Sequence, residues 1–159
     1  MKPKIYIETT IISYLTSKPS RDIIIAAHQQ ITLEWWQSQR QLFDLYASQL
    51  VVNEARAGDK EQSMERLRAL DEVELLQITD SALSLAKLLI TKGAIPQKAS
   101  EDALHISIAV VNGIDYVISW NCKHIANAKI RNKIDQVCLS CGYEPVIICT
   151  PEELMEDEQ

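Results

Sequence analysis

The sequence has few of the residues that interrupt, cross-link or anchor a chain. It contains four glycines, five prolines, four cysteines and one phenylalanine among 159 residues. No apolar run approaches the about 18 residues that a membrane span needs. Lysines at positions 2 and 4 are not followed by an apolar segment with a small-residue cleavage site, so we expect no secretory signal and no membrane association. These absences predict a cytoplasmic protein.

Several motifs that α/β enzymes depend on are also missing. There is no GxxxxGK[ST] segment for a nucleotide-binding P-loop, no GxGxxG that opens a helix, and no GxSxG for a serine nucleophile. The CxxC pair of Cys138 and Cys141 lacks the second pair of a zinc ribbon, so these residues are predicted to be buried or half-buried thiols. An aspartyl-phosphate mechanism would need an aspartate after the first strand, where this chain has Glu8.

The length and the charge distribution indicate one domain with an acidic end. A chain of 159 residues is large enough for a single buried core. The net charge is −6, but the tail PEELMEDEQ carries much of it, which leaves the rest of the chain close to neutral. We therefore predict one domain over residues 1–150 and an acidic C-terminal tail over residues 151–159.

One basic segment stands out within that near-neutral body. Residues 122–133 contain Lys123, Lys129, Arg131 and Lys133, with His124 among them. Such a segment is compatible with binding a polyanion such as RNA. A solvated helix face would have the same composition, and His124 could equally face phosphate or solvent.

Segments of strand length alternate with amphipathic segments along the chain. Expected strands cover 4–8, 46–52, 73–78, 115–120 and 145–150. Expected helices are a turn capped by Thr9 or Thr10, then 21–45 with Ser20 as its cap, 53–58, 60–70, 81–92 capped by Asp80, 101–113 capped by Ser100, and 127–141. This alternation predicts an α/β sandwich with a central parallel sheet of about five strands and helices on both faces.

Acidic residues stand close to the predicted strand ends. Glu8 ends the first strand, Glu54 lies in the first turn of the helix after the second, and Glu101 and Asp102 open the helix before the fourth. Sites in parallel sheets form beyond the carboxyl ends of the strands, so these acids can converge there. Clustered carboxylates repel one another, and Mg²⁺ or Mn²⁺ relieves that repulsion.

Each acid also has a purely structural explanation. Glu54, Glu101 and Asp102 could simply complement the dipoles of the helices that they begin. Glu8 follows an apolar strand, where an unpaired carboxylate would be expensive, so it needs a partner of some kind. His105 lies three positions after Asp102 and is predicted to be a hydrogen-bonded core residue rather than a support for a metal site.

The segments KIYIETTIISYL, VVNEA and SEDALHISIAVVNGIDYVISWNCKHIANA together resemble a PIN domain and, within that family, the VapC-type toxins of bacterial toxin–antitoxin pairs. The third segment is the most specific, and the likeness covers the chain except its acidic tail. The resemblance implies a PIN-like three-layer sandwich and an Mg²⁺- or Mn²⁺-dependent endoribonuclease. In that scheme Glu8, Glu54 and Asp102 hold the metal and, with Asn121, form the catalytic set.

The resemblance also implies roles for the surrounding residues and for partners. Thr9, Ser119 and Glu101 are expected to support the metal site, and Lys123, Lys129 and Arg131 to contact the RNA backbone. A homodimer and an antitoxin segment that covers the pocket are the expected protein partners. Ile23, Trp36 and Phe43, which lie off the main apolar stripe of the helix expected at 21–45, also favour a buried interface.

Two departures from the PIN pattern keep other functions open. Members usually have aspartate at the position of Glu8, whose extra methylene adds about 1.5 Å of reach, and they often have an acid at the position of Asn121. The missing fourth acid favours one metal ion over two. The first alternative is a weakly active or inactive PIN-like scaffold that binds RNA or a protein. A small flavodoxin-like ligand-binding domain is the second, although no phosphate-cradling loop is visible.

Overall fold

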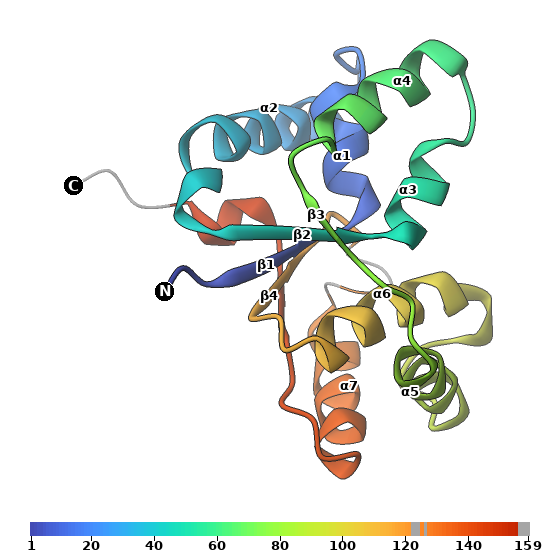
Figure 1. Cartoon of the computed structure of the whole chain (residues 1–159). Helices are drawn as coiled ribbons and strands as arrows, with labels where there is room; N and C mark the ends of the chain where they lie inside the picture. Colours follow the sequence, from blue (N-terminus) through green and yellow to red (C-terminus); the bar gives the residue numbers. More distant parts are fainter. Residues whose placement is uncertain (122–124, 126, 156–159) are drawn as a thin grey trace.

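The computed structural model describes residues 1–121, 125 and 127–155, and it shows a five-stranded parallel sheet between two layers of helices (Figure 1). The strand order is β3-β2-β1-β4-β5, with every neighbouring pair parallel. The strands are β1 (Lys4–Ile7), β2 (Asp44–Ser48), β3 (Glu74–Leu76), β4 (Tyr116–Ile118) and β5 (Ile147–Cys149). The predicted three-layer α/β fold is confirmed.

Helices cover both faces of this sheet. One layer holds α1 (Thr9–Thr16), α2 (Ile23–Ser38), α3 (Gln49–Ala55) and α4 (Lys60–Ala69); the other holds α5 (Asp80–Thr91), α6 (Ser100–Val111) and α7 (Ala128–Ser140) (Figure 1). Three short 3₁₀ helices, η1 (Arg40–Leu42), η2 (Gln97–Ala99) and η3 (Pro151–Leu154), complete the architecture. Within the described ranges, no helix is long and apolar enough to cross a lipid bilayer.

The central strand β1 is enclosed on both sides, which explains its composition. Ile5, Tyr6 and Ile7 have no exposed surface, because β2 and β4 flank β1 in the sheet and helices cover both faces. Trp120, just past β4, is also buried, and its indole Nε1 donates a hydrogen bond of 2.7 Å to Thr32 on α2. That bond ties the end of β4 to the helical layer above it.

The helix expected over 21–45 is shorter than predicted. Asp22, not Ser20, caps α2, because the Asp22 carboxylate accepts the N–H groups of Ile24 and Ile25 at 2.9 and 3.1 Å. The helix ends at Ser38, and the backbone of residues 44–46 pairs with β1 instead. Pairing in the sheet gives those buried backbone groups partners, and this outweighs the helical spacing of the apolar residues.

Helix α3 begins earlier than predicted, and this changes the position of Glu54 within the helix. The segment 46–52 was expected to be a strand, but β2 stops at Ser48, whose hydroxyl caps α3 by accepting the N–H of Val51 at 3.4 Å. Glu54 therefore lies in the last turn of α3 rather than in a first turn. A carboxylate gains nothing from the helix dipole there, so the dipole explanation for Glu54 was wrong.

The N-caps of α5 and α6 also differ from expectation. Thr79, not Asp80, caps α5, since its hydroxyl accepts the N–H of Ala82 at 3.2 Å. Ser100 is the first residue of α6 rather than its cap, because η2 runs directly into that helix. Gly93 and Gly113 end the two helices as predicted, with φ of +77° and +68°.

The cysteines in the described ranges are free thiols; of the CxxC pair, Cys138 is buried as predicted, but the prediction was wrong for Cys141, which lies on the surface just after α7. Cys138 and Cys149 are buried and Cys141 is exposed. Burial raises the pKa of Cys138 to about 11 and that of Cys149 to about 12. Because the thiolate is the reactive form, both buried residues should be inert at neutral pH.

A labelling experiment checks this arrangement. In a Cys122→Ser variant, a maleimide should modify Cys141 rapidly in the native protein, and Cys138 and Cys149 only after unfolding in urea. Peptide mass spectrometry locates the label. Rapid modification of Cys138 or Cys149 in the native protein would contradict the described core.

Candidate acidic site at the carboxyl ends of the strands

Glu8 is buried at the end of β1 and caps the helix that follows. Its side chain is only 3% exposed, and Oε2 accepts the backbone N–H of Thr10 at 2.8 Å, the Thr10 hydroxyl at 2.5 Å and the Ser119 hydroxyl at 3.1 Å. Glu8, rather than Thr9 or Thr10, is thus the N-cap of α1. Burial raises the pKa of Glu8, against the charge of His105 and the bonds from Thr10 and Ser119.

The partners of Glu8 join α1 to the segment after β4. The Thr10 hydroxyl that donates to Glu8 also accepts the N–H of Trp120 at 2.9 Å. Ser119, which has no exposed surface, accepts the N–H of Asn121 at 2.9 Å. Asn121 is half-buried beside this pair. The predicted residues Glu8, Ser119 and Asn121 are therefore brought together at one edge of the sheet.

Glu54 approaches the same region from the last turn of α3. Its Oε1 accepts the Thr9 hydroxyl at 2.6 Å and lies 2.5 Å from Nε2 of His105. Burial alone would raise the pKa of Glu54, but the hydrogen bond and charge of His105, together with the Thr9 bond, outweigh it and lower the pKa. Glu54 is accordingly the carboxylate that stays ionised.

Two residues that the sequence argument did not single out complete this arrangement. Nδ1 of His105 lies 2.6 Å from the Tyr6 hydroxyl, which in turn lies 2.8 Å from the Ser48 hydroxyl. His105 is 1% exposed, so the predicted core histidine is indeed buried, yet it also contacts an acid of the site. A tyrosine within an otherwise apolar buried strand was the available signal, because a buried phenol needs a partner.

Glu101 and Asp102 lie in the first turn of α6, as predicted. Glu101 is exposed, and a hydrogen bond with Glu54 and the charge of Glu54 raise the pKa of Glu101. Asp102 is half-buried and its charge adds to that shift. Glu54 and Asp102 thus place negative charge beside Glu101, which marks a concentration of carboxylates at this edge of the sheet.

The donor chemistry suits a hard divalent cation, although no ready-made site is present. Among the residues that the structure describes, no three His, Cys, Asp or Glu side chains are grouped so as to hold a metal ion. The available carboxylates are nonetheless the ligands that Mg²⁺ and Mn²⁺ prefer. A cation would relieve the repulsion between these neighbouring carboxylates. Binding it would require some carboxylates to turn toward it.

The predicted RNA-contacting residues are only partly placed. Lys123 lies outside the described residues, as does His124. Lys129 is exposed in the first turn of α7. Arg131 is half-buried, and its guanidinium donates to the carbonyl of Ile148 on β5 at 2.8 Å, so part of its donor capacity serves the fold.

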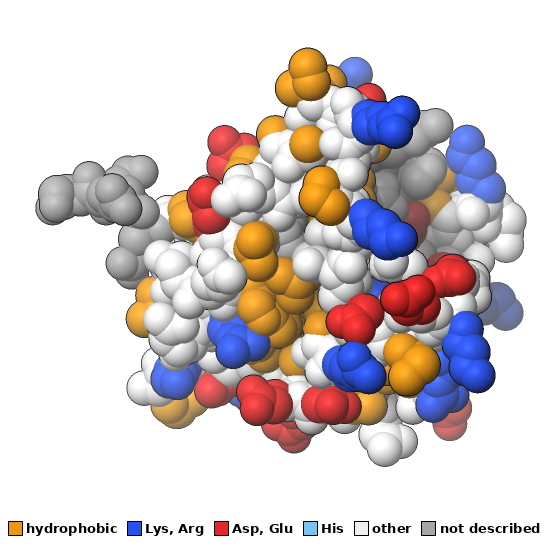
Figure 2. All heavy atoms as spheres, turned by 90° about the horizontal axis from the view of Figure 1, so that it is seen from above, with side chains coloured by type: hydrophobic (Ala, Val, Ile, Leu, Met, Phe, Trp, Pro, Cys, Tyr) orange, Lys and Arg blue, Asp and Glu red, His pale blue; other side chains and the backbone are white. Residues whose placement is uncertain are grey.

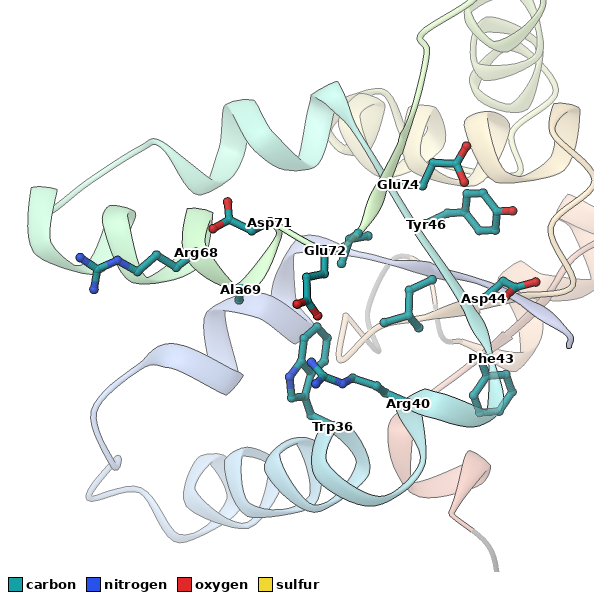
Figure 3. A pocket seen from close by; sticks show the side chains of 12 residues that line it. Trp36, Arg40, Phe43, Asp44, Tyr46, Arg68, Ala69, Asp71, Glu72 and Glu74 are labelled. Atoms are coloured by element: carbon teal, nitrogen blue, oxygen red, sulfur yellow. The ribbon is translucent and has the colours of Figure 1, made fainter.

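One of the hollows on the described surface adjoins the acids, and a larger one does not. A cavity of about 690 Å³ lies at the amino ends of β2 and β3, away from Glu8 and Glu54, and Trp36 and Arg40 form part of its wall (Figure 3). A groove of about 440 Å³ between α5 and α6 includes Glu101 in its lining. The groove, not the larger cavity, adjoins the acidic site.

Comparison with known proteins places this geometry in a known fold. No family profile and no curated protein matches the sequence. VapC20 of Mycobacterium tuberculosis, a sarcin–ricin loop cleaving toxin, aligns over 76% of this chain and 92% of its own, with a TM-score of 0.58 and 15% identity. The chain has the VapC fold. VapBC2 from Rickettsia felis, bound to a DNA fragment from its promoter, aligns over 91% of this chain and 96% of its own, with a TM-score of 0.51 and 17% identity.

Thr10 offers a test of how strongly Glu8 is held within this VapC fold. Thr10→Val should lower the free energy of unfolding by about 1–3 kcal/mol, because it leaves a buried carboxylate oxygen and the Trp120 N–H each short of a partner. Urea denaturation measures the change. The matched control is Thr16→Val on the same helix, whose hydroxyl donates to the carbonyl of Ile12, with an expected change within about 0.5 kcal/mol. Equal losses in the two variants would contradict the role given to Thr10.

Proposed function

We propose that this protein is a metal-dependent endoribonuclease and the toxin of a toxin–antitoxin pair. The observation that carries the proposal is the convergence of Glu8 and Glu54, each held by hydrogen bonds from the first turn of α1, at the carboxyl edge of a sheet with the VapC fold. That edge is where a parallel sheet builds its sites. A cytoplasmic location accords with an RNA substrate and stays a prediction.

Glu8, Glu54 and Asp102 are the residues that we assign to Mg²⁺ or Mn²⁺. The ion, when bound, supplies a water of lowered pKa and charge stabilisation for the phosphodiester. Thr9 and His105 keep the Glu54 carboxylate oriented and ionised. Ser119 and Thr10 hold Glu8 in place.

Asn121 stands beside Ser119, where its side-chain amide can orient the attacking water or offer its carbonyl as a ligand. Lys129, Arg131 and Lys123 are proposed to position the RNA backbone. Single-stranded loops are the accessible targets for such a site, because their bases and phosphates are not enclosed in a duplex. The description of VapC20 as a sarcin–ricin loop cleaving toxin supports this substrate class.

The surface of the α1–α4 layer supports the proposal of protein partners. Figure 2 looks onto this layer and shows hydrophobic side chains gathered in a hollow, with Lys and Arg side chains nearby. Ile23 and Ile24 on α2 are 85% and 68% exposed, and Met64 on α4 is 46% exposed. Exposed apolar side chains of this kind favour a partner surface, and we assign it to a homodimer contact or the antitoxin.

An inactive RNA- or protein-binding scaffold is the second candidate, and one observation favours it. Glu8 accepts hydrogen bonds from Thr10 and Ser119 and burial raises its pKa, so it can be stable as a structural group without any metal. In that case Glu8 acts only as the N-cap of α1, and the protein binds its partner without cleaving it.

Substitution of the acids separates the two candidates. Glu8→Gln, Glu54→Gln and Asp102→Asn should each lower the rate of RNA cleavage in Mn²⁺ by at least about 100-fold, since each removes a charged ligand. Gel analysis of a labelled single-stranded RNA measures the rate. The control is Glu65→Gln, an exposed acid on α4 paired with Arg68, which should cleave like the wild type. Equal cleavage by all four variants would rule out the proposed site.

Metal removal is an independent check. Dialysis against EDTA should abolish cleavage, and Mn²⁺ or Mg²⁺ should restore it whereas Ca²⁺, which prefers larger coordination numbers, should restore less. Undiminished cleavage in EDTA would contradict metal dependence.

A further inference from the structure

We infer that His105 is a positioning residue for Glu54, held in its working orientation by Tyr6 and Ser48. The inference rests on the proposed function, because it concerns the carboxylate that we assign to the metal. It assigns a role in the site to Tyr6 and Ser48, which are buried in two strands of the sheet.

The contacts form one continuous chain across four elements. Ser48 ends β2, Tyr6 is in the centre of β1, His105 is on α6, and Glu54 is on α3. The successive separations are 2.8 Å from Ser48 Oγ to the Tyr6 hydroxyl, 2.6 Å from there to His105 Nδ1, and 2.5 Å from Nε2 to Glu54 Oε1. Ser48 and Tyr6 have no exposed surface and His105 is 1% exposed, so water does not compete for the bonds among these three residues.

The contacts in this chain fix the orientation of the imidazole. The carboxylate of Glu54 accepts, so Nε2 of His105 carries the proton in that bond. Nδ1, on the other side of the ring, lies against the Tyr6 hydroxyl, which also contacts Ser48. Burial raises the pKa of Tyr6, so the phenol stays protonated. The phenol thereby fixes which nitrogen of His105 faces the carboxylate.

The effect on Glu54 is that two donors from different helices hold the same carboxylate oxygen. Both His105 and Thr9 bind Oε1, so neither of these donors takes Oε2. The donors arrive from α6 and α1, which restricts rotation of a side chain that sits in the last turn of a short helix. Groups that orient a metal-binding carboxylate in this way commonly affect metal affinity as strongly as 10–100-fold when removed.

A matched pair of substitutions separates positioning from core packing. In His105→Gln the amide nitrogen can reach the position of Nε2 and donate to Glu54, whereas in His105→Asn it reaches only the position of Nδ1 and meets Tyr6. Each variant loses one bond of the chain, so a merely structural histidine predicts similar effects of both. Positioning predicts a large difference in metal affinity between them.

The measurement is Mn²⁺ binding by titration calorimetry on the full chain, with kcat and KM for RNA cleavage alongside. His105→Asn should weaken Mn²⁺ binding about 10–100-fold and lower kcat with little change in KM. His105→Gln should stay within about threefold of the wild type in affinity, and thermal unfolding should report similar stability losses for both. Equal Mn²⁺ affinities for the Asn and Gln variants would overturn the inference.

Tyr6→Phe provides a second test should a His105 variant not fold. It keeps the aromatic ring in the core and removes only the hydroxyl, and Mn²⁺ binding should weaken about three- to tenfold because the ring orientation of His105 is no longer fixed. Unchanged affinity would overturn the inference. Glu54→Gln distinguishes failure of the inference from failure of the proposed function. If Glu54→Gln binds Mn²⁺ like the wild type, both the inference and the proposed function fail. If Glu54→Gln binds Mn²⁺ weakly while the His105 and Tyr6 variants bind it normally, only the inference fails.

Discussion

The buried carboxylates at the edge of the sheet need hydrogen-bond donors, and the rest of this site depends on that constraint. Glu8 is nearly enclosed and Glu54 is partly enclosed, and neither could persist there without donors. The two are compensated differently. Burial keeps the pKa of Glu8 raised despite its hydroxyl and amide donors, whereas the contact with His105 outweighs burial at Glu54 and lowers its pKa.

The elements of the VapC fold serve this compensation as much as they serve the core. The hydroxyls of Thr9 and Thr10, adjacent on α1, diverge to two different acids, Glu54 and Glu8. Ser119 reaches Glu8 from the other side, beyond β4. Helix α1 therefore connects both acids through its first turn, and the hydroxyl residues that the PIN resemblance placed near the metal lie beside its proposed ligands.

The parts of this arrangement that follow from the sequence are those that depend on a short stretch of chain. The alternation of strands and helices, and the positions of Glu101 and Asp102 at the start of α6, were predictable because apolar spacing and helix ends are local. The segment 44–52 was not, because Val51 and Val52 favour a strand by propensity and become helical only through packing in α3. The error placed Glu54 at the wrong end of its helix. The contact of Tyr6 with His105 was beyond reach because nothing in the sequence says which face of β1 meets α6.

The side-chain contacts that run from Ser48 through Tyr6 and His105 to Glu54 have a consequence for how the protein folds during synthesis. They join residues 42, 99 and 51 positions apart, so none of them can form through local folding. These contacts begin at Ser48, the N-cap of α3, pass through residues of β1 and α6, and end at Glu54 in the last turn of α3. A nascent chain that has not yet been synthesised through residue 105 cannot assemble the site at all. The proposed site therefore cannot form until residues 1–105 have left the ribosome and folded together.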